Sequence, residues 1–130
     1  MSSLTERLDA VQAALTQAAD AAGRPAAAVQ LIAVSKTFPA ADIEALYRHW
    51  QRHFGENYVQ EWQQKTEALA HLPDVVWHFI GHLQSNKTRV VAERAHWLHT
   101  VDRLKVAERL SAQRPADLAD LNVCLEVNIS

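Results

Sequence analysis

The stretch Val29-Gln-Leu-Ile-Ala-Val34, followed at once by Ser35-Lys36-Thr37, determines the fold predicted for this chain. Its length, its β-branched residues and its apolar character favour a buried strand. Pro39 then predicts the start of a helix, whose inward face includes Ile43 and Trp50. The stretch is therefore interpreted as the strand of a strand–helix unit, with a lysine close behind it.

The same pattern recurs along the chain. After a first helix that starts near Leu4 and ends at Gly23, runs typical of strands occupy residues 29–34, 52–54, 75–80, 97–100 and 122–129. They start about 22 to 25 residues apart with a helical segment between each pair, which predicts parallel strands joined by right-handed crossovers. An open doubly wound sheet and part of a (β/α)8 barrel both satisfy this pattern. The Gly-rich phosphate loop of a dinucleotide fold is missing after the first strand, which favours the barrel.

The composition indicates an ordinary folded domain. The chain has 130 residues, a net charge of −2, and 48% hydrophobic and 22% charged residues, which is too apolar for a disordered tail. It contains no apolar run of about 18 residues and no secretory signal at its N-terminus, so we expect a cytoplasmic protein without a membrane partner. The lone Cys124 excludes an internal disulfide, and the near-neutral charge argues against nucleic acid as a partner.

Polar residues follow the predicted strands at the edge where parallel α/β folds place their sites. Lys36 follows the first strand there, and its uncharged amine is a nucleophile that can form a Schiff base with a carbonyl group. The alternative is a lysine that ends a strand and reaches solvent. His78 and His82 have a spacing that binds metals on a helix, but Gly81 and a strand end intervene, so we predict no metal site.

Five motifs resemble the pyridoxal phosphate homeostasis family. They are Leu31-Ile-Ala-Val-Ser-Lys-Thr37, Phe54-Gly-Glu-Asn-Tyr-Val-Gln-Glu61, Trp77-His-Phe-Ile-Gly-His-Leu-Gln-Ser-Asn-Lys87, His99-Thr-Val-Asp-Arg103 and Val127-Asn-Ile-Ser130. The resemblance implies a (β/α)8 barrel like the N-terminal domain of alanine racemase, with pyridoxal 5′-phosphate (PLP) as its cofactor. It implies that Lys36 forms the internal aldimine and that Asn57, His78 and Asn128 line the ring side of the pocket.

The function implied by the resemblance is PLP homeostasis. Proteins of this family carry or buffer PLP without robust catalysis, so no catalytic residue is assigned, and PLP-dependent apoenzymes are expected as partners. Two alternatives stay open. One is a Schiff-base enzyme that uses Lys36 in the manner of an amino-acid racemase or an aldolase, and the other is a fragment that binds no cofactor.

The number of strands sets an expectation about the domain. A (β/α)8 barrel has eight strands, and three units beyond the five predicted would need roughly 70 more residues. We therefore expect residues 1–130 to be the N-terminal part of a barrel whose C-terminal strands and phosphate-binding segment are missing. The family members are expected to be monomers, whereas an open final strand in this chain would favour self-association.

Overall fold

The computed structural model describes residues 3–129, in which helices and strands alternate. The α-helices are α1 (Leu4–Ala21), α2 (Ala40–Arg48), α3 (Val59–Ala68), α4 (Thr88–Arg94) and α5 (Leu104–Gln113). The strands are β1 (Ala33–Val34), β2 (His53–Glu56), β3 (Val76–Phe79), β4 (Trp97–Val101) and β5 (Asn122–Leu125). Two short 3-10 helices, η1 (Ala26–Ala28) and η2 (Ser85–Lys87), complete the elements.

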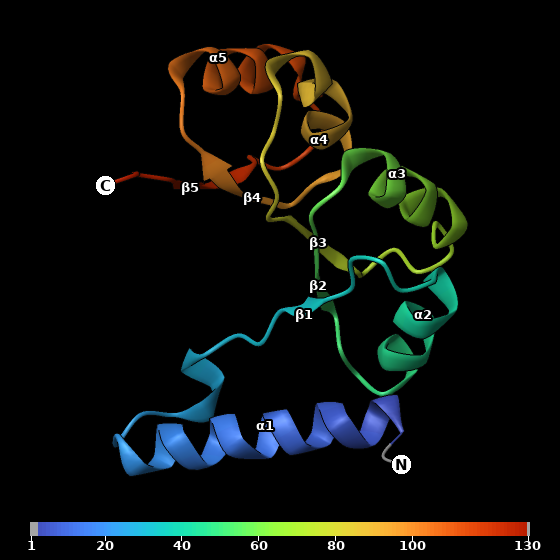
Figure 1. Ribbon diagram of the computed structural model, residues 1–130, viewed down its shortest axis with the longest axis vertical. Helices are drawn as coiled ribbons and strands as arrows, with labels where there is room; N and C mark the ends of the chain where they lie inside the picture. Colours follow the sequence, from blue (N-terminus) through green and yellow to red (C-terminus); the bar gives the residue numbers. More distant parts are fainter. Residues whose placement is uncertain (1–2, 130) are drawn as a thin grey trace.

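The strand order decides between the two architectures that the sequence left open. Within residues 3–129 the five strands form one parallel sheet in the order β1-β2-β3-β4-β5. Right-handed crossovers that all advance in one direction place every connecting helix on the same face, whereas a doubly wound sheet reverses and has helices on both faces. Figure 1 shows α2 to α5 outside one curved face, with α1 beside α2 at the β1 end. The fold is thus that of a partial (β/α)8 barrel, as predicted.

The hydrophobic core lies between the sheet and the outer helices. Alternate residues of each strand point toward the helices, and among them Phe54, Phe79 and Leu98 have no exposed surface. Trp62 of α3 is also fully buried, and its ring lies 5.6 Å from that of Phe79 in a tilted arrangement. Burying side chains of this size stabilises the fold by about 2–3 kcal/mol each, so this layer holds the helices against the sheet.

The predicted element boundaries are corrected in three places. β1 covers Ala33–Val34 in place of residues 29–34, because the chain bends at Val29, just after η1, and only Ala33 and Val34 pair with β2. β5 ends at Leu125 in place of residue 129. β2 covers His53–Glu56 in place of residues 52–54, so Glu56 is a strand residue that faces the core.

The position of Trp50 corrects another prediction. Trp50 does not lie on the inward face of α2, because that helix ends at Arg48 and the indole side chain belongs to a residue that is 82% exposed. The Trp50 backbone has a φ of 74°, and the N–H groups of Trp50 and Gln51 donate to the carbonyls of Tyr47 and Leu46. This is the Schellman ending of a helix, in which glycine usually takes the left-handed position. α1 ends in the same way with Gly23 at a φ of 69°.

Candidate functional site

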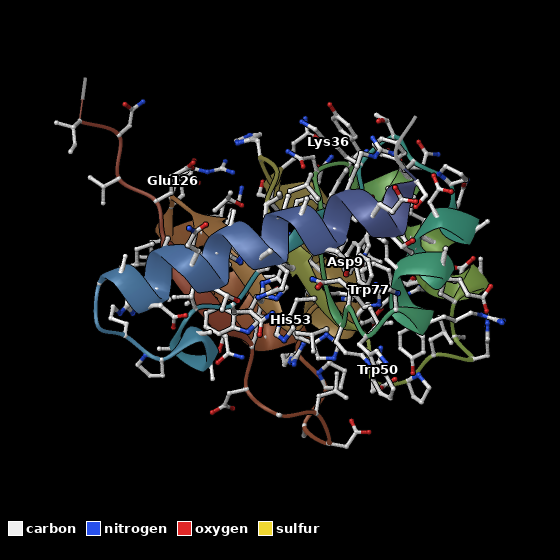
Figure 2. All side chains as sticks on the ribbon, turned by 90° about the horizontal axis from the view of Figure 1, so that it is seen from below. Asp9, Lys36, Trp50, His53, Trp77 and Glu126 are labelled. Carbon is white, nitrogen blue, oxygen red and sulfur yellow. The ribbon has the colours of Figure 1, made fainter. Side chains whose placement is uncertain are left out.

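Lys36 lies at the edge of the sheet where the parallel strands end. It follows β1 after a single residue, Ser35, and its side chain is exposed. Within the described part of the chain, no hydrogen bond or ion pair engages the Lys36 amine. Figure 2 shows Lys36 and Glu126, which directly follows β5, on the upper edge of the molecule, with Trp50 on the lower edge. The place of Lys36 at the carboxyl edge of the sheet is the one that the sequence predicted. Its amine is accessible, as in the alternative of a lysine that ends a strand and reaches solvent.

Asn57 occupies the matching place on the neighbouring strand. Val34 pairs with Gly55, so Lys36 and Asn57 each stand two residues beyond a paired position. The side-chain oxygen Oδ1 of Asn57 is buried and has no hydrogen-bond partner among residues 3–129. A buried acceptor without a hydrogen bond lowers the stability of the folded state. A ligand with a hydrogen-bond donor at this position would therefore gain a hydrogen bond to Asn57 Oδ1.

Gly81, just after β3, packs closely against the backbone of Asn57. A Cβ atom at residue 81 would lie 2.0 Å from the backbone oxygen of Asn57, so only glycine permits this approach. The carbonyl oxygen of Gly81 accepts a hydrogen bond from the Thr100 hydroxyl at 2.7 Å, and Arg103 donates to the Leu83 carbonyl at 2.7 Å. The loop after β3 is thereby tied to the two strands on either side of it.

His78 lies further from the carboxyl edge of the sheet than Lys36 and Asn57, because it pairs with Gly55 inside the β2–β3 ladder. Its Nε2 atom is 2.8 Å from Nδ1 of His53, and its Nδ1 atom is 2.9 Å from Nε2 of His99. Its ring also stacks on Trp97, with the ring centres 5.8 Å apart. Both ring nitrogens are engaged by histidines, so a ligand near His78 would meet the imidazole ring and not a free nitrogen.

The electrostatics of this histidine chain follow from its burial. His78 is 3% exposed, and desolvation together with the neighbouring His53, His99 and His96 lowers the pKa of His78 to about 4. Burial also lowers the pKa of His53 and of His99. The three rings therefore share hydrogen bonds as neutral imidazoles near neutral pH. Sequence reasoning found no pattern in His53 and His99, although one histidine on each of three successive strands is a signal that could have indicated their adjacency.

Asn128 is the predicted site residue that the structure leaves apart from the others. It is exposed, lies beyond the end of β5, and lines a shallow hollow with Asp102, Glu126 and Val127. Three strands separate β5 from β1 in the sheet, so Asn128, which follows β5, stands at the opposite side of the sheet from Lys36, which follows β1.

A buried charged cluster beneath Lys36 was missed by the sequence reasoning. Lys65 of α3 donates from Nζ to Glu56 Oε2 at 2.9 Å, to Glu61 Oε1 at 2.8 Å and to the Ser35 carbonyl oxygen at 2.8 Å. Ser35 donates its hydroxyl to Glu56, and the Thr37 N–H donates to Glu61 Oε1 at 2.6 Å. The spacing of Glu61 and Lys65, four residues apart on one helix, is a signal that could have indicated part of this cluster.

Among residues 3–129, no three or more His, Cys, Asp or Glu side chains are arranged to hold a metal ion. In the same part of the chain, no helix is both long enough and apolar enough to span a membrane.

Comparison with known proteins identifies the relatives of this chain. It is 55% identical to the pyridoxal phosphate homeostasis protein of Pseudomonas aeruginosa and 47% identical to that of Escherichia coli K12, over its whole length in both cases. The resemblance to the pyridoxal phosphate homeostasis family is confirmed. No family model matches the chain. The chain spans about half of these homeostasis proteins, since each alignment covers 56% of the relative.

Solved structures that are similar to this chain show the same architecture. PipY of Synechococcus elongatus PCC7942 with PLP bound is 45% identical and superposes with a TM-score of 0.71, covering 85% of this chain and 48% of PipY. A protein of unknown function from Bifidobacterium adolescentis is 31% identical and superposes with a TM-score of 0.78, covering 85% of this chain and 49% of that protein. The partial barrel seen here is therefore an arrangement that known structures share.

Proposed function

We propose that this chain binds PLP through the Lys36 amine and serves PLP homeostasis. The observation that carries the proposal is an exposed lysine without a partner in the described chain, at the carboxyl edge of a sheet that superposes on PLP-bound PipY. When bound, PLP supplies an aldehyde carbon with which an uncharged amine condenses reversibly to a C=N bond, releasing the carbonyl oxygen as water. Lys36 supplies that amine.

The residues proposed to line the site beside Lys36 have the chemistry needed to bind the flat, partly polar ring of PLP. Ile32 and Ile80 are half-buried, and their side chains both pack over Gly55. A Cβ atom added at Gly55 would lie 3.2 Å from the side chain of Ile32 and 3.1 Å from that of Ile80. These two residues provide an apolar surface, and the unpaired Asn57 Oδ1 provides an acceptor for a donor group. The neutral rings of the His78 chain add no positive charge beneath this surface.

The test identifies which lysine reacts. The chain is incubated with one equivalent of PLP, the visible band of the condensed form is recorded, and borohydride reduction followed by peptide mapping locates the modified residue. We expect modification of Lys36, and loss of the band in Lys36→Ala but not in the control Lys87→Ala, which changes an exposed lysine of η2. Modification of Lys65, Lys87 or Lys105 with Lys36 untouched would overturn the proposal.

We propose further that the bound PLP passes to PLP-dependent apoenzymes in the cytoplasm. The reversibility of the condensation supports release to another amine, and no acid–base pair for chemistry on a substrate has been assigned to the site. Mixing the PLP-loaded chain with a PLP-dependent apoenzyme is expected to restore that enzyme's activity faster than Lys36→Ala incubated with the same total PLP. Robust racemisation of L-alanine by the loaded chain would favour an enzyme instead.

We also propose that residues 1–130 form the N-terminal part of an eight-stranded barrel domain. The sequential order of the strands and the 56% coverage of the relatives support this. The coding sequence that follows codon 130 provides the test. Three further strand–helix units in the same frame are expected, and a stop codon directly after Ser130 would contradict the proposal.

A further inference from the structure

The buried cluster beneath Lys36 is unusual because it places a full ion pair inside the protein. Lys65 is 5% exposed and Glu56 is fully buried. Removing both charges from water is costly, and the attraction within the pair offsets this desolvation only when the hydrogen bonds of both ions are complete. They are complete here, because the three donors of the Lys65 ammonium meet Glu56, Glu61 and the Ser35 carbonyl oxygen.

The cluster holds the chain on both sides of Lys36. On one side, the Ser35 carbonyl accepts from Lys65, and the Ser35 hydroxyl donates to Glu56. On the other side, the Thr37 N–H donates to Glu61 at 2.6 Å. Lys36 is the single residue between these two anchors, so its Cα position and the direction of its side chain depend on them.

The backbone beside Lys36 needs such an anchor. Thr37 has a φ of 67°, a left-handed conformation that is strained for a β-branched residue. Within the described chain, the N–H of Thr37 has Glu61 as its partner in this conformation. The Lys65 ammonium, and after it the Thr37 N–H, keep the pKa of Glu61 below its ordinary range despite partial burial, so the acceptor stays charged.

We propose that Glu56, Glu61 and Lys65 are positioning residues that hold residues 35 to 37 so that the Lys36 amine is aimed at its aldehyde ligand. The inference rests on the proposed function of Lys36 and assigns to the cluster a role beyond stability. The cluster lies on the helix side of the sheet, so it acts through the backbone of Ser35 and Thr37 and not by touching the ligand.

Glu61 offers the sharpest test because its side chain is 29% exposed and its loss leaves the Glu56–Lys65 pair intact. Glu61→Ala removes the acceptor for Thr37, whereas Glu61→Gln keeps an oxygen at the same place. Glu67→Ala is the matched control, since it removes a 59% exposed carboxylate from the same helix, where it pairs with Arg94.

The experiment follows the condensation of PLP with each variant of the 130-residue chain by stopped flow. The rate that is compared is the one that disappears in Lys36→Ala. Misplacing a reacting group by about 1 Å slows a reaction by up to roughly a hundredfold. We expect Glu61→Ala to be about tenfold slower or more, Glu61→Gln to stay within about threefold of wild type, and Glu67→Ala to match wild type. A Glu61→Ala rate equal to wild type would overturn the inference.

A second measurement separates this inference from the proposed function. Lys36 is dimethylated with ¹³C-formaldehyde and borohydride, and its NMR signal is assigned by its absence in Lys36→Ala. We expect Glu61→Ala, and not Glu67→Ala, to shift and narrow this signal as the amine loses its fixed direction. If wild type fails to condense with PLP, the proposed function is wrong. In that case an unchanged Lys36 signal in Glu61→Ala overturns the positioning role as well, and a changed signal supports it.

Discussion

Acidification is expected to destabilise this protein through His78. The folded state holds His78 as a neutral ring between His53 and His99, with a pKa of about 4, whereas in the unfolded chain the imidazole has its ordinary pKa of 6.5. Above pH 6.5 the His78 ring is neutral in both the folded and the unfolded state, so it does not make stability depend on pH there. As the pH falls from 6.5 toward 4, His78 becomes protonated in the unfolded state but stays neutral in the folded state, so the free energy of unfolding decreases over this pH range.

The size of the effect follows from the two pKa values. A shift from 6.5 to about 4 corresponds to about 3 kcal/mol if water is fully excluded from the ring. His53 and His99 are only half-buried, so water near the chain of rings screens part of the charge. We therefore expect His78 to lower the free energy of unfolding by about 2 kcal/mol between neutral pH and pH 4.

Urea unfolding followed by tryptophan fluorescence at a series of pH values measures this loss. The variant His78→Gln keeps side-chain donors and acceptors between the two neighbouring rings but cannot titrate. The slope of the unfolding free energy against pH reports the difference in bound protons between the unfolded and folded states. In His78→Gln this difference is expected to be smaller by about one proton at the steepest point of the wild-type curve. Equal slopes in wild type and His78→Gln, or an NMR titration of His78 centred at 6.5, would refute the reasoning.

Three further predictions concern stability and are measured by denaturant unfolding at constant pH. Gly81→Ala is expected to cost about 3 kcal/mol or more, because its Cβ would lie 2.0 Å from a backbone oxygen, and an unchanged stability would contradict that contact. Lys65→Met is expected to cost about 3–5 kcal/mol because Glu56 stays buried without its partner, and adding Glu56→Gln should recover much of the loss. Equal losses in the single and double variants would contradict the ion pair. Trp50→Gly is expected to raise the free energy of unfolding by about 0.5–1 kcal/mol, because glycine adopts the left-handed conformation at residue 50 without strain. Gly23→Ala is expected to lower it by a similar amount for the opposite reason. Changes of the same sign in the two variants would argue against left-handed strain.

The regular features of the fold could be predicted from the sequence. Alternating strand-like and helix-like runs at a constant interval are sufficient to indicate parallel strands, and the missing Gly-rich loop correctly favoured the barrel. Lys36 could be placed at the carboxyl edge for the same reason, because it follows a strand within two residues. These predictions depend on local patterns, which the sequence displays directly.

The missed features depend on contacts between distant residues. Glu56 lies beyond the predicted strand of residues 52–54, and only the β2–β3 register shows that it is a strand residue. Its side chain faces the core, where it is the buried partner of Lys65. The chain of His53, His78 and His99 arises only when three strands lie side by side. Trp50 was misplaced because an apolar residue in step with a helix face looks buried, even where the helix has already ended.

The sequential strand order has a consequence for how the chain folds. Each ladder pairs residues about 20 to 25 positions apart, as in Ala33 with Phe54, Phe54 with Trp77, and Leu98 with Val123. Because the entropy of closing a loop grows only with the logarithm of its length, every pairing step carries nearly the same penalty. Each unit also needs only the strand made before it. The sheet can therefore grow strand by strand in the order of synthesis, without waiting for a distant segment to close it.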